Sequence, residues 1–318
     1  MQGITASAYR LVLRAAEPLD LPGEKGTMLR SGFGVALKRV VCAYPVPAAR
    51  ECGSCPLRAT CVFPRLFDAV LPDQAKPRDG DAPRPFVFRV PRDRRTHYEE
   101  GDTLDVEFVL IGWAREYLPY VTLALASLAD GGMGPVRGHF ALREVWSVDP
   151  FGRAPLRLDA DVGTAPAHTI DWTTLRQRAA GLPADGVTVR FLTPTRFVTE
   201  HRPMPRPSFY ALIAALRRRA EALSRYHCGV AWAPDYEALA EAARRVGVTR
   251  ERLAWRERTR RSTRDGDVMP MGGVMGEMVY VGDMRLFREL LALGEVIHAG
   301  KCAAFGNGQI CCEAPCKE

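Results

Sequence analysis

Residues 294–308 read Gly-Glu-Val-Ile-His-Ala-Gly-Lys-Cys-Ala-Ala-Phe-Gly-Asn-Gly. This stretch predicts a short strand that runs into a glycine-rich turn carrying one imidazole, His298, and one ammonium, Lys301. Gly300, Gly306 and Gly308 can adopt positive φ and let a ligand approach the backbone closely. Such a turn presents N–H groups to an anion, and the lysine adds a point charge. A tight turn that binds nothing is the alternative, because clustered glycines mark loops in general.

Positive charge is concentrated in one segment upstream of this turn. The formal net charge is +7, from 44 Lys and Arg against 37 Asp and Glu. Nine arginines and two glutamates lie between Arg244 and Arg264, and the rest of the chain is neutral. Guanidinium groups bind phosphate oxygens bidentately, so the segment suits a nucleic-acid backbone. A solvated helix face with internal ion pairs is the alternative, although two glutamates cannot neutralise nine arginines.

Size and composition are those of a globular protein with two domains. The chain has 318 residues, of which 47% are hydrophobic and 25% charged. No apolar run of 18 residues occurs, so we expect no membrane span. The first ten residues lack the basic-then-apolar pattern of a signal peptide. We therefore expect a cytoplasmic protein whose nine cysteines stay reduced.

Four of the cysteines form a pattern typical of a metal site. Cys42 is followed after nine residues by Cys52, then by Cys55 and Cys61 in a C-x2-C-x5-C arrangement. Four soft thiolates suit zinc or an iron–sulfur cluster, and the spacing leaves both open. No histidine or carboxylate accompanies them, so the role we expect is structural rather than catalytic. Four reduced cysteines in a packed insertion are the alternative.

Hydrophobic periodicity predicts the same order of elements twice. Residues 1–149 give strand, helix, cysteine-rich insertion, two strands, helix, glycine-rich turn and strand, and residues 187–318 repeat this order after a linker at 150–186. We predict an α+β protein of two tandem ferredoxin-like βαββαβ domains, with the insertion in the first and the glycine-rich loop in the second. The last helix is predicted at 284–293, N-capped by Asp283 and ended by Gly294. Placed side by side, two such domains would form a cleft.

Several short motifs follow one another in the second half. From residue 271 the chain reads Met-Gly-Gly-Val-Met-Gly-Glu-Met-Val-Tyr, and then come Gly282-Asp283, Gly-Glu-x-x-His298-x-Gly-Lys301 and Gly306-x-Gly308. Ser262-Thr-Arg264 precedes them, and Leu192-Thr-Pro-Thr-Arg196 and the cysteine stretch lie further upstream. In order and spacing these motifs resemble the CRISPR-associated Cas-six precursor-RNA endoribonucleases of the RAMP superfamily, in a subfamily that contains a cysteine cluster.

The resemblance implies an endoribonuclease that cuts CRISPR repeat RNA without a catalytic metal ion. In that reaction the 2′-hydroxyl beside the scissile phosphate attacks, and a 2′,3′-cyclic phosphate remains. The implied partners are precursor and mature CRISPR RNA and other subunits of a CRISPR effector complex. The RNA-binding residues that we assign on this basis come from the arginine segment and the two glycine-rich turns: Arg256, Arg258, Arg260, Arg261, Arg264, Gly300, Gly306, Gly308 and Arg137.

One departure from the family bears on catalysis. Many members carry a catalytic histidine on or just after the first helix, and the predicted helix at 28–41 has none. His298 is the leading replacement, with an inward-facing strand histidine as the alternative. His201 is second, His97 is third, and Lys301 is the expected charge stabiliser. The missing histidine leaves a second hypothesis open, in which the protein is a catalytically inactive RNA-binding subunit of an effector complex.

Overall fold

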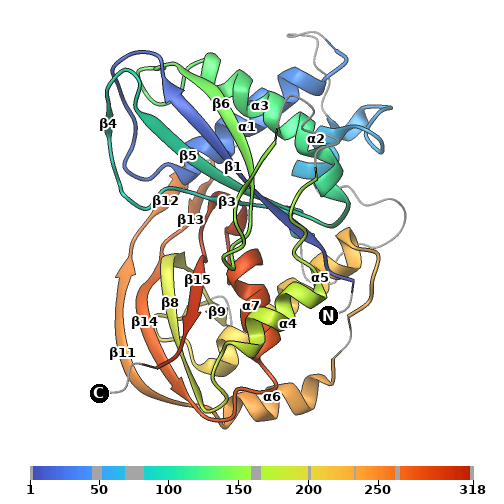
Figure 1. Ribbon diagram of the computed structural model, residues 1–318, viewed down its shortest axis with the longest axis vertical. Helices are drawn as coiled ribbons and strands as arrows, with labels where there is room; N and C mark the ends of the chain where they lie inside the picture. The colour runs from blue at the N-terminus through green and yellow to red at the C-terminus, as the bar shows by residue number, and fades with distance from the viewer. Residues whose placement is uncertain are drawn as a thin grey trace. The chain divides into compact units, whose positions relative to one another are not determined.

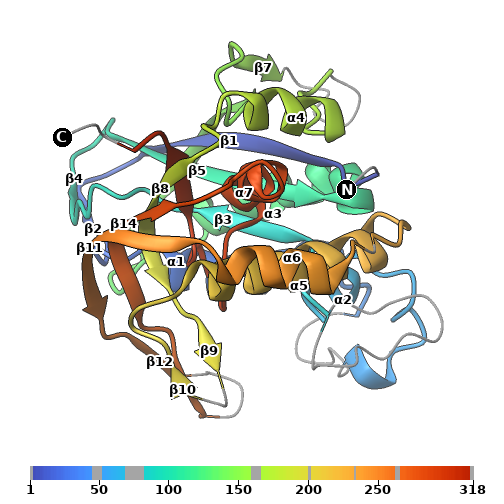
Figure 2. The ribbon, with the colours of Figure 1, turned by 90° about the horizontal axis from the view of Figure 1, so that it is seen from below.

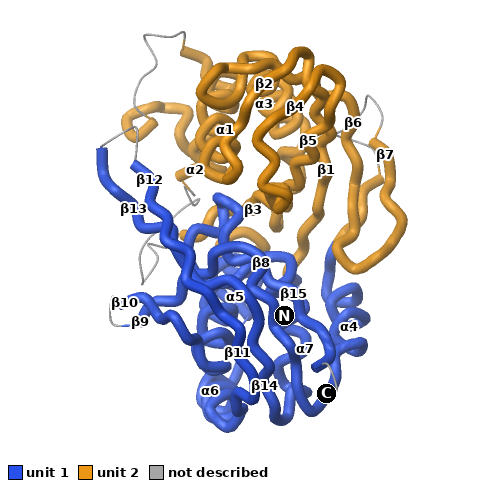
Figure 3. The backbone as a smooth tube through the Cα atoms, turned by 90° about the vertical axis from the view of Figure 1, so that its left-hand side faces the viewer, with its two compact units in different colours: residues 1–3, 170–225, 230–318 blue, residues 4–169, 226–229 orange. Residues whose placement is uncertain are grey.

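The computed structural model describes residues 3–44, 52–68, 82–158, 166–199, 202–232, 234–261 and 266–315. The chain divides into two compact units, drawn in two colours in Figure 3. Unit 1 comprises residues 1–3, 170–225 and 230–318, and unit 2 comprises residues 4–169 and 226–229. In the part of the chain described, no helix is both long and apolar enough to cross a bilayer.

Unit 2 is built on a five-stranded antiparallel sheet whose central strand is β1 (Figure 1). The sheet has the order β3-β5-β1-β6-β7, with β1 at Ala6–Ala15, β3 at Phe86–Arg89, β5 at Thr103–Ile111, β6 at Phe140–Val148 and β7 at Leu156–Leu158. The helices are α1 at Gly26–Val41, α2 at Val62–Phe67 and α3 at Leu118–Asp130, and single 3₁₀ turns occur at Cys52–Ser54 and Gly112–Tyr117. The short strands β2 (Leu19–Asp20) and β4 (His97–Tyr98) pair with each other.

The core of unit 2 is aromatic where α1 meets the sheet. Phe33 of α1 lies 5.3–5.9 Å, between ring centroids, from Phe86, Phe88 and Phe108 of the sheet and 5.4 Å from Phe67 of α2. These rings are buried, and tilted or edge-to-face pairs of this kind add to the free energy of burial. The cluster fixes α1 and α2 against β3 and β5.

Unit 1 repeats the arrangement with a four-stranded antiparallel sheet of order β11-β14-β8-β15. Its strands are β8 at Gly186–Thr195, β11 at Gly247–Arg256, β14 at Gly273–Val281 and β15 at Ile310–Glu313. Its helices are α4 at Trp172–Ala180, α5 at Phe209–His227, α6 at Tyr236–Arg244 and α7 at Arg288–Ile297, and Ala303–Phe305 form a 3₁₀ turn. Two small hairpins complete it, β9 (Val198–Thr199) with β10 (Arg202–Pro203) and β12 (Thr259–Arg261) with β13 (Val268–Pro270).

Two contacts inside unit 1 hold α7 in place. Phe209 of α5 lies 5.1 Å from the Tyr280 ring of β14 and 4.9 Å from the Phe287 ring, which precedes α7. On α4, the guanidinium of Arg178 donates two hydrogen bonds, of 2.8 and 2.9 Å, to the Glu295 carboxylate of α7. Glu295 is only 8% exposed, so this bidentate pair satisfies a buried charge.

Both units confirm the predicted ferredoxin-like βαββαβ order, and the fold class predicted from the sequence is correct. In each sheet the first strand lies between the third and fourth of the motif, and all neighbours are antiparallel. The alternation of apolar residues that predicted β5 is visible as its burial pattern. Asp235 is the N-cap of α6, and its carboxylate accepts a 3.0 Å hydrogen bond from the Ala238 N–H.

The prediction for residues 294–298 was wrong. Gly294 does not end a helix; it lies inside α7, which continues to Ile297, and no strand forms there. A Cβ at position 294 would lie 2.9 Å from Leu216 and 3.0 Å from Ile310, so glycine serves close packing rather than termination. Asp283 caps no helix either: it accepts hydrogen bonds from Arg285, and α7 begins at Arg288. The last strand of the unit is β15, beyond the turn.

Candidate nucleic-acid interface

The glycine-rich loop begins where α7 ends and folds back on the end of β8. Ala299 N–H donates to the Gly308 carbonyl at 2.7 Å, which closes the loop on itself. Lys301 N–H donates to the Arg196 carbonyl at 3.1 Å, and Gly308 N–H donates to the Pro194 carbonyl at 3.1 Å. The loop is therefore held by backbone hydrogen bonds to residues 194–196.

Positive φ makes glycine necessary at two of its positions. Gly300 has φ of 74°, and a Cβ there would lie 2.5 Å from the Arg196 carbonyl oxygen. Gly308 has φ of 78°, and its Cβ would lie 1.9 Å from the Ala299 carbonyl oxygen. A side chain at either position would have to push backbone apart, so the sequence pattern reflects the tightness of the loop.

His298 is placed inside this loop and not on its surface. It is the C-cap of α7, with φ of 64°, and its side chain is 0% exposed. Its Nδ1 lies 3.0 Å from the Asn307 carbonyl oxygen, a contact between the two ends of the loop. Buried in this way, the imidazole is out of reach of an RNA hydroxyl in the described conformation. The geometry favours the supporting role, one of the two roles that the sequence left open.

The arginine segment lies directly against the loop. Met271 and Gly272 both donate their N–H to the Arg258 carbonyl, at 2.8 and 2.9 Å. The buried Asn307 side chain in turn donates to the Met271 carbonyl at 2.8 Å. These hydrogen bonds connect the arginine segment, the residues before β14 and the loop. β12 and β13 continue the β11–β14 pair beyond the sheet (Figures 1 and 2).

Four cations gather at this junction. Burial raises the pKa of the Cys302 thiol in the loop, and the positive charges of four neighbouring side chains oppose that rise: those of Arg196, Lys301, Arg258 and Arg260. We call these four residues the cationic loop cluster. Lys301 is exposed and the three arginines are half-buried, so their charge is available to a ligand at the surface. Converging cations beside a tight backbone turn form an arrangement that binds phosphate.

The remaining RNA-binding candidates fall in three places. Arg256 is exposed at the end of β11, opposite Gly273, and Arg261 is exposed on β12. Arg137 belongs to unit 2, where it is exposed with φ of 53° in the turn closed by the Met133–Gly138 bridge. Arg264 and His201 lie outside the described residues.

Arg196 is the site residue that sequence reasoning left out. It was noted only as part of a motif, yet its carbonyl anchors Lys301 and its guanidinium donates to the Gly272 carbonyl at 3.4 Å. Its guanidinium carbon also lies 5.8 Å from the centroid of the Trp255 ring. No sequence signal distinguished it, because its position after β8 becomes significant only when the glycine loop closes against that strand.

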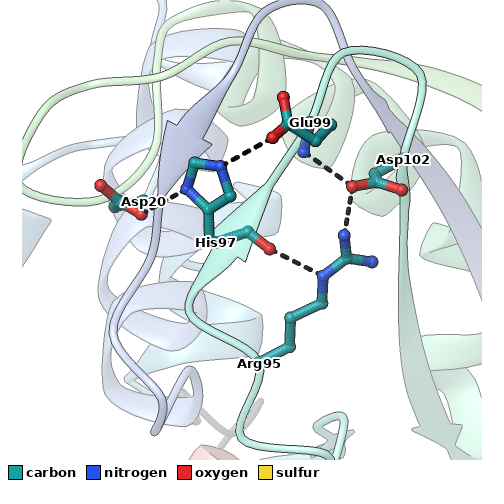
Figure 4. Close-up of polar contacts among 5 residues, drawn as sticks. All are labelled: Asp20, Arg95, His97, Glu99 and Asp102. Atoms are coloured by element: carbon teal, nitrogen blue, oxygen red, sulfur yellow. Dashed lines mark hydrogen bonds and ion pairs between the residues drawn. The ribbon is translucent and has the colours of Figure 1, made fainter.

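His97 lies in unit 2 between two carboxylates (Figure 4). Its Nδ1 is 2.8 Å from an Asp20 oxygen and its Nε2 is 3.2 Å from a Glu99 oxygen. These hydrogen bonds, with that to Asp20 the larger cause, raise the pKa of His97 above its usual value. Arg95 braces the same turn through the His97 carbonyl and the Asp102 carboxylate. Because both ring nitrogens are hydrogen-bonded to carboxylates, His97 is not an open base. We call His97, Asp20 and Glu99 the His97 clasp.

The four clustered cysteines line one cavity in unit 2. Cys42 follows α1, Cys52 begins a 3₁₀ turn, Cys55 follows that turn and Cys61 is the N-cap of α2. The cavity has a volume of about 30 Å³. As the described side chains stand, no three or more His, Cys, Asp or Glu residues are arranged to hold a metal ion. The metal predicted from the spacing therefore stays a prediction.

Ion pairs also cover one face of the unit 1 sheet. The Arg190 guanidinium lies 3.7 Å from the Glu277 carboxylate and 3.4 Å from that of Glu313, and Arg250 lies 3.7 Å from Glu277. These side chains come from β8, β11, β14 and β15, so they follow one another across all four strands. Positive charge on this face of the sheet is therefore matched by carboxylates.

Comparison with known proteins points to one family. Residues 189–310 match the family model of the CRISPR-associated endoribonuclease Cas6, and residues 4–169 match AF_1859_N, described as an N-terminal domain. A comparison with curated protein sequences finds no match.

Solved structures resemble the chain over nearly its whole length. The match to Thermus thermophilus Cas6 covers 98% of this chain and 100% of that protein's chain, at 20% identity and a TM-score of 0.55. The match to a Cas6 product complex covers 97% of this chain and 100% of the matched chain, at 18% identity and a TM-score of 0.56. The match to a partial Cas6–RT–Cas1–Cas2 complex covers 98% of this chain and 46% of the matched chain, at 11% identity and a TM-score of 0.62. At such identities the likeness establishes the fold.

The Cas6 family model spans most of β8, the arginine segment, α7 and the glycine loop. These elements carry the cationic loop cluster. The two family models together take in nearly the whole chain, and the fold agrees throughout. The second half of the chain therefore belongs to the Cas6 family of CRISPR-associated endoribonucleases, and the chain as a whole has the fold of Cas6 structures.

Proposed function

We propose that the protein is a metal-independent endoribonuclease that binds CRISPR repeat precursor RNA and cleaves it by attack of a ribose 2′-hydroxyl. The products are a 2′,3′-cyclic phosphate end and mature guide RNAs. The observation that carries the proposal is the cationic loop cluster, in which Arg196, Arg258, Arg260 and Lys301 surround one turn of tight backbone. We also propose that the protein acts in a prokaryotic cytoplasm, where its further partners are other subunits of a CRISPR effector complex.

The cluster supplies what such a reaction requires of its surroundings. As the 2′-oxygen attacks in line, negative charge builds up on the phosphate oxygens, and preorganised cations stabilise it. Lys301 is the exposed point charge of the loop and takes this role. The arginines hold flanking phosphates and so keep the attacking and leaving oxygens aligned, which contributes to the rate through positioning.

The acid–base group is assigned separately from the loop. His298 fixes the loop from inside and acts as a positioning residue, since its imidazole is buried. His201 remains the candidate for proton transfer to or from the reacting oxygens, which typically contributes about 10²–10⁴-fold to the rate. Its substitution is therefore expected to lower the rate constant for cleavage within this range and to leave RNA binding unchanged.

The test is cleavage of cognate repeat RNA by the full chain in the presence of EDTA. The expected product carries a cyclic phosphate, and a single 2′-deoxy nucleotide at the cut site should abolish cleavage but retain binding. That substituted RNA is the matched control, because it removes only the nucleophile. Cleavage that depends on added divalent metal, or that continues with the 2′-deoxy substrate, would refute the mechanism.

An inactive RNA-binding subunit is the second candidate function. Two observations favour it: α1 carries no histidine, and His298 is buried. This alternative predicts tight binding of repeat RNA, with a steep dependence of affinity on salt, and no cleavage across several cognate repeats. Intact RNA together with such binding would decide in its favour.

A further inference from the structure

The cavity lined by the four clustered cysteines carries chemistry that RNA cleavage does not use. Three separate pieces of chain supply its thiols: the end of α1, the 3₁₀ turn with the residue after it, and the N-cap of α2. These residues are all half-buried, and all are free thiols. Four unpaired thiols from a stretch of twenty residues thus line one cavity.

The donor set is uniform. Besides Cys42, Cys52, Cys55 and Cys61, the lining consists of apolar, aromatic and basic residues together with backbone, and it includes no histidine and no carboxylate. Four thiolates with no open position are the ligand set of a structural tetrahedral zinc site. A cavity of about 30 Å³ admits one small guest, since a water molecule needs roughly 10–15 Å³ by the same measure.

The charge of the lining complements such a centre. Zinc bound by four thiolates carries a net charge of about −2, from the ion and its ligands. Lys38 and Arg58 both line the cavity, and each supplies one positive charge. The Lys38 ammonium lies 5.8 Å from the centroid of the Phe63 ring, so its stem runs alongside the first turn of α2. Basic side chains of this kind would offset the charge of the centre.

We propose that Cys42, Cys52, Cys55 and Cys61 bind one zinc ion that links the end of α1 to the start of α2. The thiols surround the cavity without coordination geometry as they stand, and binding of the ion draws them together, since metal sites are rarely preformed without their metal. The link would reinforce aromatic packing, because Phe63 stacks on Phe67 at 5.0 Å and Phe67 contacts Phe33 of α1 at 5.4 Å. The site is structural and independent of RNA cleavage.

The test is metal analysis of the full-length protein purified under reducing conditions. We expect about one zinc per chain in the wild type, and binding reduced to about a tenth or less in the Cys52→Ser/Cys61→Ser variant. The Cys311→Ser variant is the matched control: its thiol lies on β15, outside the cavity, and its zinc content should equal that of the wild type. Iron with acid-labile sulfide in place of zinc would overturn the assignment, and so would zinc that persists in the double variant.

A second measurement covers the case in which the double variant does not fold. Wild-type protein stripped of metal is titrated with Co²⁺, which gives intense visible absorption when four thiolates surround it tetrahedrally. The expected result is saturation at about one equivalent, followed by displacement of the cobalt by zinc. Absence of these bands in the folded wild-type chain would overturn the proposal.

Discussion

The guanidinium carbon of Arg260 lies 5.1 Å from the centroid of the Phe305 ring, so β12 contacts the 3₁₀ turn of the glycine loop. Phe305 is 8% exposed, and the contact covers it. A cation over a ring is held in place by the ring quadrupole and by the apolar surface beneath it. The contact joins the two features that sequence analysis singled out separately, the arginine segment and the glycine-rich turn, within one unit.

Replacement of Arg260 by alanine should weaken RNA binding and reduce its dependence on salt. Each lost phosphate contact lowers the slope of log K against log salt by about 0.7 to 0.9. The measurement is filter binding of repeat RNA at several salt concentrations. Arg285→Ala is the control, because that arginine lies outside the cationic loop cluster and pairs with Asp283 at 2.7 Å. Equal effects of the two substitutions would show that Arg260 contributes only general charge.

A methyl group at position 308 should disrupt the loop. In Gly308→Ala the new Cβ would meet the Ala299 carbonyl oxygen at 1.9 Å while the backbone stays at φ of 78°. Strain of this kind costs on the order of 1–3 kcal/mol and moves backbone, so both stability and RNA affinity should fall. Gly247→Ala is the control, since its Cβ would meet nothing nearer than 3.9 Å. Chemical denaturation and RNA binding by the two variants check this, and wild-type affinity in Gly308→Ala would contradict the role of the loop.

The burial of His298 predicts what its substitution does. His298→Ala removes the contact between Nδ1 and the Asn307 carbonyl and leaves that buried carbonyl unsatisfied, at a cost of about 1–3 kcal/mol in the free energy of unfolding. Binding and cleavage should then decline together, because the loop loses its internal support. Denaturation curves and single-turnover kinetics separate the possibilities. Lost cleavage with unchanged stability and binding would instead make His298 a catalytic residue.

The clasp around His97 predicts a dependence on pH. Its pKa in the folded protein lies above the 6.5 of an unperturbed imidazole, because Asp20 and, less strongly, Glu99 favour the charged form. The resulting stabilisation is present in full below pH 6.5 and is lost as pH rises through the raised pKa. An NMR titration of His97 should show the raised pKa, and Asp20→Asn should lower it more than Glu99→Gln. An identical titration curve in both variants would contradict the clasp.

The two ion pairs of α4 predict a contrast in stability. Arg178→Met strands the Glu295 carboxylate, which is 8% exposed, and should cost about 3–5 kcal/mol in the free energy of unfolding. Arg176→Met breaks an exposed pair with Glu289, at 3.7 Å, and should cost about 0–1 kcal/mol. Urea denaturation of both variants measures the difference. Similar small losses would show that the buried pair is readily replaced.

Sequence periodicity was sufficient for the ferredoxin-like order because strands in both sheets contain stretches of alternating apolar and polar residues, as at 104–108 in β5 and 187–191 in β8. It failed at residues 294–298, where glycine was interpreted as a stop signal. There, glycine is a packing residue inside α7, and only the positions of Leu216 and Ile310 across the core show this. The burial of His298 is likewise a tertiary property, since it depends on the return of the loop to Asn307.

The candidate site could likewise be predicted only in part, because local sequence patterns do not show tertiary contacts. Charge density identified the arginine segment, and glycine spacing identified the loop, because both are local properties of the sequence. Their contact through Met271 and Asn307 joins residues distant along the chain, and no local pattern encodes it. Arg196 was missed because a single arginine after a strand has no distinctive sequence signal; its significance comes from the carbonyl that anchors Lys301.

The ion pairs of Arg190, Glu277, Arg250 and Glu313 form a row across the unit 1 sheet that does not favour binding of a polyanion. The two arginines and two glutamates of this row sum to zero, so the row offers little net attraction to an approaching RNA strand. Encounter would then be governed by the loop edge, where the cationic loop cluster lies. A transcript would be oriented by this asymmetry before any of its bases is read.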